Sequence, residues 1–238
     1  MSDVDRGPEL ARTDGRDAPI RVLIVDDDAL VRAGLSMMLG GAADLEIVGE
    51  AEDGTQVLAA IDAHRPDVVL MDIRMPKLDG LAATRLVRAR PGAPEVIVLT
   101  TFDVDDHVVT ALCDGAAGFL VKDTPPTEIL RAIRLVAAGD AMLSPRVTRK
   151  LVDHLAASNA PAISARAAEL LGELTERERE VAIAVGRGSS NAEVAAALYM
   201  SVATVKAHVS RLLMKLDLDN RVQIALLVHD AGLSADAR

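Results

Sequence analysis

The feature that most constrains the fold is a set of five short apolar runs separated by segments with helical spacing. These runs are apolar on consecutive positions rather than on alternate ones. A parallel strand covered by helices on both faces needs such a run, because both of its sides are buried. The pattern predicts a doubly wound α/β domain with a five-stranded parallel sheet. The expected strands are 22–25, 46–48, 68–71, 96–99 and 118–121, and the expected helices are 29–39, 55–64, 80–89, 105–114 and 127–138.

From Leu174 onward the spacing is helical throughout. Thr175, Ser190, Ser201 and Asn220 are residue types that cap helix N-termini, and all but Ser201 have Glu or Gln three positions later. These signals predict an all-α domain of four helices near 176–186, 191–198, 202–216 and 221–231. Before them, an Ala-rich stretch with a helix start at 144–146 indicates a partly helical linker. The expected organisation is a disordered leader at 1–19, the α/β domain at 20–140, the linker at 141–172 and the helical domain at 173–238.

Composition excludes several classes of protein. Half of the 238 residues are hydrophobic, so a packed core is expected rather than disorder. Residues 1–143 carry a net charge of −11 and residues 173–238 only −1, which argues against a nonspecific nucleic-acid coat. The single cysteine, Cys113, cannot form an internal disulfide and is expected to fill a small core position. No apolar run approaches the length of a membrane span, so we expect a soluble, cytoplasmic protein without a membrane partner.

Polar side chains follow several of the predicted strands. Asp26 and Asp27 come directly after the first strand, Asp72 after the third, Thr100 ends the fourth and Lys122 follows the fifth. Because parallel strands end at the same edge of a sheet, these groups are expected to converge there. Three clustered carboxylates repel one another unless a cation lies among them, and Mg²⁺ prefers oxygen ligands. A carboxylate nucleophile with Mg²⁺, an ammonium and a hydroxyl suits phosphoryl transfer; the alternative is three solvated loop acids.

The chain also resembles a known family at these positions. The run Asp72-Ile73-Arg74-Met75-Pro76-Lys77-Leu78-Asp79-Gly80, with Val25-Asp26-Asp27 and Phe119-Leu120-Val121-Lys122, resembles response-regulator receiver domains over about residues 20–140. The resemblance implies that Asp72 accepts phosphate from a sensor histidine kinase and that Lys122 pairs with the phosphoryl group. It implies a Mg²⁺ ion bound by Asp26, Asp27, Asp72 and the main-chain carbonyl of Arg74.

The resemblance further implies that Thr100 and Phe119 are the switch residues. Thr101 is an alternative to Thr100 as the switch hydroxyl, but Thr100 precedes Lys122 by 22 positions, which is the spacing in receiver domains. Asp28 stands where relatives often have histidine, so it either faces the mouth of the site or lies exposed.

The third helix of the C-terminal domain is its positive feature. It carries Lys206, Arg211 and Lys215 and no acid before Asp217. Its apolar positions Val202, Val205, Val209, Leu212, Leu213 and Leu216 fall on one face. Small residues on the other face permit close approach to a major groove, although a positive helix face by itself is more often a solvated surface.

Three segments of this domain closely resemble the LuxR-type helix-turn-helix. They are 174–181, 190–195 and 204–209, and Lys215, Leu216 and Arg221 continue the pattern. The resemblance places Lys206, Ala207 and Ser210 near base edges of double-stranded DNA. It places Asn191, Thr204, Arg211 and Lys215 at phosphates. Val222, Leu226 and Leu227 of the last helix either pair two such domains or complete the core within one.

The two domains in this order resemble the NarL/FixJ family of transcriptional response regulators. This implies a non-enzymatic transcription factor in which phosphorylation of Asp72 controls dimerisation and sequence-specific DNA binding as a homodimer. One alternative is an acid-rich, Mg²⁺-dependent phosphatase resembling the haloacid dehalogenases, but the consecutive Asp26, Asp27 and Asp28 lack the expected Asp-x-Asp spacing. Another is a phosphorylation-independent DNA-binding regulator. The cognate kinase, stimulus, DNA site and resting arrangement of the domains stay open.

Overall fold

The computed structural model describes residues 18–100, 108–143 and 161–233. Residues 1–17 of the expected leader, the competing Thr101 and the helix start at 144–146 lie outside these ranges. The receiver-like domain consists of β1 (Ile20–Val25), α1 (Ala29–Leu39), β2 (Leu45–Ala51), the 3-10 helix η1 (Gly54–Gln56), α2 (Val57–His64), β3 (Val68–Asp72), α3 (Gly80–Arg88), β4 (Glu95–Thr100), α4 (Val108–Cys113), β5 (Gly118–Val121), α5 (Pro126–Ala137) and β6 (Met142–Leu143).

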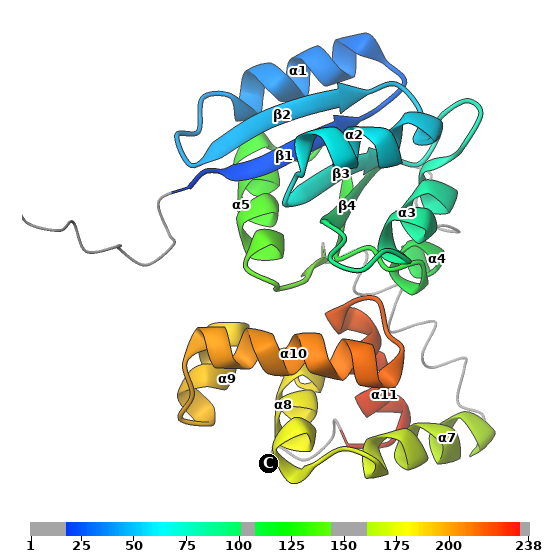
Figure 1. Cartoon of the computed structure of the whole chain (residues 1–238), viewed down its shortest axis with the longest axis vertical. Coiled ribbons are helices and arrows are strands. Elements are labelled where there is room, and N and C mark those ends of the chain that lie inside the picture. Colours follow the sequence, from blue (N-terminus) through cyan, green and yellow to red (C-terminus); the bar gives the residue numbers. More distant parts are fainter. Residues whose placement is uncertain (1–17, 101–107, 144–160, 234–238) are drawn as a thin grey trace, which may run out of the picture.

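The sheet is parallel and doubly wound, as the apolar runs predict. Its strand order is β2-β1-β3-β4-β5-β6, so β1 and β3, which precede the acids, are neighbours. α1 and α5 cover one face and α2, α3 and α4 the other (Figure 1). In β1, Val22 and Ile24 face the first layer while Leu23 and Val25 face the second, and all four are buried. Burial on both sides explains why the strand is apolar at consecutive positions.

The strand count corrects the expectation of five strands. The sixth strand, β6, pairs with β5 through Met142 and Leu143, within the segment expected to be linker. A strand of two residues has too little periodicity to be recognised in the sequence. The expectation that Cys113 fills a core position is also wrong, because this residue is exposed. It lies on the outer side of α4, where the C-terminal domain contacts this helix.

The C-terminal domain is entirely helical. Its helices are α7 (Pro161–Gly172), α8 (Glu176–Gly186), α9 (Asn191–Ala197), α10 (Val202–Leu216) and α11 (Arg221–Asp230). The expected capping boxes form at Thr175 with Glu178 and at Ser190 with Glu193. Asn220 caps α11, but the side chain of Gln223 accepts from the Asp219 amide instead of from the cap residue. α7 packs on this domain through Leu171, so the helical unit has one helix more than the four expected.

Candidate phosphoacceptor site and DNA-binding surface

The predicted acids meet at the carboxyl edge of the sheet. One carboxylate oxygen from each of Asp26, Asp27 and Asp72 lies within 4.8 Å of the other two. Lys122 Nζ lies 2.7 Å from Asp26 Oδ2 and 3.0 Å from Asp72 Oδ2, so its ammonium joins the two buried acids. Thr100 ends β4 and is buried, and the Lys122 amide donates to its carbonyl at 2.7 Å. The strand ends therefore bring these five residues to one edge, as expected from a parallel sheet.

Burial and charge act against each other at Asp72. Burial raises the pKa of the Asp72 carboxyl, the hydrogen bond and charge of Lys122 lower it, and the neighbouring Asp26 charge raises it; the net pKa is raised. Burial disfavours the ammonium of Lys122, but its hydrogen bonds to Asp26 and Asp72 together raise the pKa of that amine. Two buried acids share one cation here, so the cluster keeps an excess of negative charge that a divalent cation would neutralise.

Backbone contacts hold the acids in place. Arg32 of α1 donates to the Asp26 carbonyl at 2.7 Å, and the Asp26 side chain accepts from the Asp28 amide at 3.0 Å. Asp28 itself is exposed and caps α1 by accepting from the Leu30 amide. The Ile73 amide donates to Asp72 Oδ1 at 2.9 Å, which leaves Oδ2 toward Lys122.

Glycine is required where α3 begins beside the phosphoacceptor strand. The Gly80 amide donates to the Ile73 carbonyl at 2.9 Å. A Cβ atom on Gly80 would stand 1.9 Å from the carbonyl oxygen of Asp72, far inside van der Waals contact. The glycine of the predicted signature thus lets α3 begin directly against the backbone of Asp72.

Sequence reasoning missed an ion pair that fixes the loop after Asp72. Lys77 has a left-handed backbone, with φ of 65°, and its Nζ lies 2.5 Å from Asp53 Oδ2. The hydrogen bond from Lys77 has the largest effect on the Asp53 carboxyl, whose pKa is lowered to about 2. The Gly54 amide donates to the Leu78 carbonyl at 3.2 Å, so the two loops are joined at a second point. The Asp53-Gly54 pair indicates a turn in the sequence, but nothing there points to Lys77, which is 24 residues away from Asp53.

The second predicted surface lies on α10. Val205, Val209, Leu212 and Leu216 are buried in the helical core, whereas Val202, expected on the same face, is 43% exposed at the start of the helix. The outward residues follow the predicted pattern. Thr204, Lys206, Ala207, Ser210, Arg211 and Lys215 are all exposed. Lys215 is not free, because its Nζ lies 2.9 Å from Glu178. Asn191, expected at a phosphate, is only 3% exposed.

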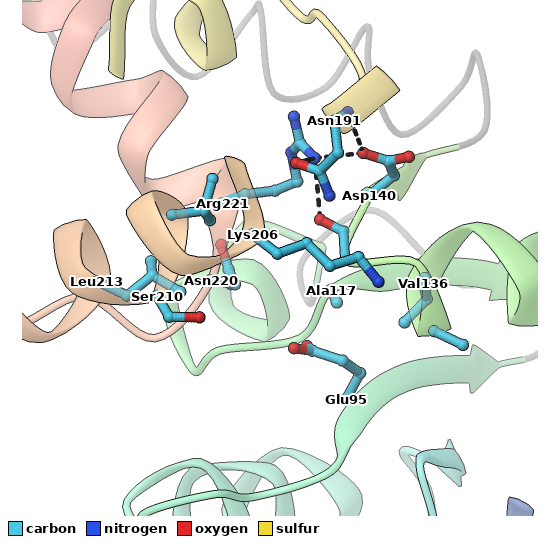
Figure 2. A pocket seen from close by; sticks show the side chains of 13 residues that line it. Glu95, Ala117, Val136, Asp140, Asn191, Lys206, Ser210, Leu213, Asn220 and Arg221 are labelled. Carbon is cyan, nitrogen blue, oxygen red and sulfur yellow. Dashed lines mark hydrogen bonds and ion pairs between the residues drawn. The ribbon is translucent and has the colours of Figure 1, made fainter. Parts of the chain in front are cut away.

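The receiver-like domain covers part of this surface. Lys206 and Ser210 line a cavity together with Glu95 and Val136 of the first domain (Figure 2). In Figure 1, α10 faces the end of the sheet opposite to the strand ends that carry the acids. Asn220 donates to the carbonyl of Leu112 in the last turn of α4 at 2.8 Å and to the carbonyl of Ala116, just after that helix, at 3.0 Å.

The last helix has a third role besides the two expected ones. Val222 is buried in the hydrophobic cluster of the first domain, and Leu226 packs against the same cluster. Leu227 instead packs within the helical core. The apolar surplus of α11 therefore completes an interface between the two domains of one chain.

Comparisons with known proteins identify the family of each domain. Residues 22–134 match the family described as "Response regulator receiver domain", and residues 172–228 match "Bacterial regulatory proteins, luxR family". The transcriptional regulatory protein LiaR of Bacillus subtilis is 36% identical, over 88% of this chain and 97% of that protein. This chain belongs to the NarL/FixJ family of response regulators.

Other relatives match this response regulator over nearly its full length. The response regulator VraR of Staphylococcus aureus is 35% identical, over 90% of this chain and 98% of that protein. The transcriptional regulatory protein YhcZ of Bacillus subtilis is 36% identical over 91% of this chain and 99% of that protein. Among solved structures, the response regulator ChrA of a heme-sensing two-component system superposes with a TM-score of 0.50 at 35% identity, covering 91% of this chain and 99% of ChrA. No helix in the described part of this response regulator is long and apolar enough to cross a membrane.

Proposed function

We propose that a sensor histidine kinase phosphorylates Asp72 in a Mg²⁺-dependent reaction, and that this controls dimerisation and sequence-specific DNA binding. The observation that carries the proposal is the ammonium of Lys122 between Asp26 and Asp72, with Asp27 completing the acidic cluster. A structural ion pair needs one acid for one base. Here two buried acids share one ammonium and the exposed Asp27 adds a third carboxylate at the same edge, an excess of negative charge that a cationic ligand would neutralise.

The donor set fits Mg²⁺. Asp26, Asp27 and Asp72 offer carboxylate oxygens close enough to share one ion, and Arg74 follows Asp72 closely enough to offer its main-chain carbonyl. Hard divalent cations take such oxygens as ligands. When bound, Mg²⁺ would neutralise charge on the acids and on the phosphoryl oxygens.

The chain's own residues perform the remaining steps. An oxygen of Asp72 attacks the phosphorus of phosphohistidine, the bond between phosphorus and nitrogen breaks, and the electron pair stays with the imidazole. Lys122 then pairs with a phosphoryl oxygen in place of its contact with Asp26. The hydroxyl of Thr100, at the end of β4, turns toward the new phosphoryl group, and Phe119, fully buried in β5, responds to that movement. The product is an acylphosphate, so no general base is required.

α4 connects this event with the DNA-binding domain. It follows Thr100 in the chain, and its last turn accepts hydrogen bonds from Asn220 and Gln223 through the carbonyls of Leu112 and Cys113. A change in β4 that moves α4 would therefore weaken the interface between the domains. In the closed arrangement Lys206 and Ser210 line a cavity against the first domain, so opening removes the domain that stands between them and a DNA duplex.

The DNA contacts follow from the exposed face of α10. We propose Lys206, Ala207 and Ser210 near base edges in a major groove and Asn191, Thr204, Arg211 and Lys215 at phosphates. Contact by Lys215 requires its pair with Glu178 to open. Opening also uncovers Val222 and Leu226 of α11, which supports pairing of two copies on two half-sites.

The test compares the wild type with Asp72→Asn after incubation with acetyl phosphate and Mg²⁺. We expect the wild type to form one acylphosphate per chain and to bind duplex DNA more tightly, and the variant to do neither. Asp79→Asn is the matched control, because asparagine keeps the cap of α3 and removes one acid of the same loop. An equal gain in DNA affinity for Asp72→Asn would favour phosphorylation-independent control. Steady turnover of a phosphomonoester would favour the phosphatase.

A further inference from the structure

The clearest unexplained contact between the domains is a carboxylate from the first domain placed on a buried arginine of the second. Arg221 is only 9% exposed and forms an ion pair with Asp140. The same oxygen of Asp140 accepts from the Asn191 amide at 3.0 Å (Figure 2). The Asn191 side chain donates to the Ala138 carbonyl at 2.9 Å.

Two of the four hydrogen-bond partners that Arg221 has among the described residues, Gly139 and Asp140, belong to the other domain; the Asn191 side-chain oxygen, at 3.4 Å, is one of the two in its own. Arg221 donates to Gly139 at 2.9 Å as well as to Asp140, and within its own domain it donates to the Ser189 carbonyl at 2.6 Å. When the domains separate, the guanidinium loses its only anionic partner in the described part of the chain. Separation uncovers the guanidinium and leaves its donors without an anion, so the open form can accept a new anion at this position through charge-assisted hydrogen bonds.

The position lies on the surface that would meet DNA. Arg221 and Asn191 line the same cavity as Lys206 and Ser210 of α10 (Figure 2). Asn191 is the first residue of α9, the first helix of the helix-turn-helix, and in such units the first helix crosses the DNA backbone. The atoms that Asp140 contacts are reached from outside the domain, so they are accessible to another macromolecule.

We propose that Arg221 and Asn191 form a binding site for a DNA backbone phosphate, and that Asp140 occupies this site in the closed form as a substitute for the phosphate. A carboxylate and a phosphodiester are both anions that accept charge-assisted hydrogen bonds from a guanidinium. The proposal rests on the proposed DNA binding and is independent of phosphorylation at Asp72. Asp140 then has a specific role, because its carboxylate competes with DNA for Arg221 and Asn191.

The test uses the full-length, unphosphorylated chain and a fluorescently labelled DNA duplex of mixed sequence, because phosphate contacts do not depend on base sequence. We expect Asp140→Asn to raise the affinity roughly ten- to hundredfold, since a charge-assisted contact that holds the competitor is lost. In that background, Arg221→Gln should lower the affinity and reduce the slope of log affinity against log salt by about one. Arg221→Lys should recover part of that slope. Thermal melts identify any variant that fails to fold.

Lys206→Ala in the same background separates the two proposals. If Lys206→Ala weakens binding but Arg221→Gln changes neither affinity nor slope, Arg221 is only a latch between domains and the phosphate site is wrong. If Asp140→Asn leaves the affinity unchanged while Arg221→Gln lowers it, Asp140 is not a competitor and the substitution idea fails. If no variant binds the duplex and Lys206→Ala has no effect, DNA binding itself is refuted.

Discussion

The hydrogen bonds of Asn220 allow the closed arrangement to be broken without damage to either domain. Its side-chain nitrogen donates to two carbonyls of the first domain, and its side-chain oxygen caps α11 through the Gln223 amide at 2.9 Å. Asn220→Asp keeps the capping oxygen, and aspartate is as good an N-cap as asparagine. It removes both donors and sets a carboxylate against two carbonyls that lie 2.8 and 3.0 Å from the original nitrogen.

Asn220→Asp is expected to destabilise only the closed form, in which the lost hydrogen bonds are made. Each lost hydrogen bond is worth about 0.5–1.5 kcal/mol, and leaving buried acceptors unpaired adds to this, so closure should weaken by about 2–4 kcal/mol. That shifts the balance between closed and open forms by roughly 30- to 700-fold, because each 1.4 kcal/mol is about tenfold. The apparent affinity for DNA scales with the open fraction and should rise until the open form predominates.

The assay measures anisotropy of a labelled duplex with unphosphorylated protein, together with the radius of gyration from small-angle scattering. Thr175→Asp is the control, because it adds the same charge at the exposed cap of α8, a position without a contact to the first domain among the described residues. Both variants change the net charge by the same amount, so a rise in affinity for Asn220→Asp and not for Thr175→Asp reports the opening, because added negative charge by itself lowers affinity for DNA. An unchanged radius of gyration, with the same affinity for both variants, would refute the reasoning.

Three further predictions concern the first domain. Gly80→Ala should destabilise this domain by at least about 1–3 kcal/mol, because the added methyl group overpacks against the Asp72 carbonyl. Gly34→Ala lies inside α1 with open space around it and should stabilise the domain by about 1 kcal/mol. Urea denaturation measures both, and equal effects would contradict the steric argument. The Asp53 carboxyl should titrate near its pKa of about 2 by NMR and move up toward 4 in Lys77→Met but not in Lys77→Arg. Because that folded pKa is depressed, the stability gained from Lys77 should be complete above about pH 4 and lost as the pH falls toward 2, so the difference in urea midpoint between wild type and Lys77→Met should shrink from pH 6 to pH 3. Asp27→Asn should weaken Mg²⁺ binding in a calorimetric titration by at least about tenfold, and an unchanged affinity would exclude Asp27 as a ligand.

Much of each domain could be predicted because its signals are local. The buried strands are apolar at consecutive positions, and the caps Thr175, Ser190 and Asn220 mark helix starts. The helices α8, α9, α10 and α11 begin directly after their predicted cap residues and end within one residue of expectation, whereas α7 was not among the four expected helices. The convergence of the site residues follows from topology, because strands that run parallel deliver their next residues to one edge.

The long-range polar contacts were beyond the reach of sequence periodicity. Asp53 and Lys77, Asp140 and Arg221, and Asn220 and Leu112 are polar pairs from distant segments. A polar side chain has many candidate partners in the sequence, and only packing decides which one it meets. β6 is too short to show a pattern, and Val222 is as apolar in an intradomain core as in a domain interface.

The sequence by itself determined the two folds, because burial of one helix face or of both strand faces dictates which positions are apolar. It also determined the chemistry of the acidic edge, because the polar residues directly follow the strands. Only the tertiary structure decided that α10 faces the first domain and that Asp140 pairs with Arg221. That docking uses long-range polar contacts and the apolar side chains of Val222 and Leu226, which leave no periodic trace along the chain.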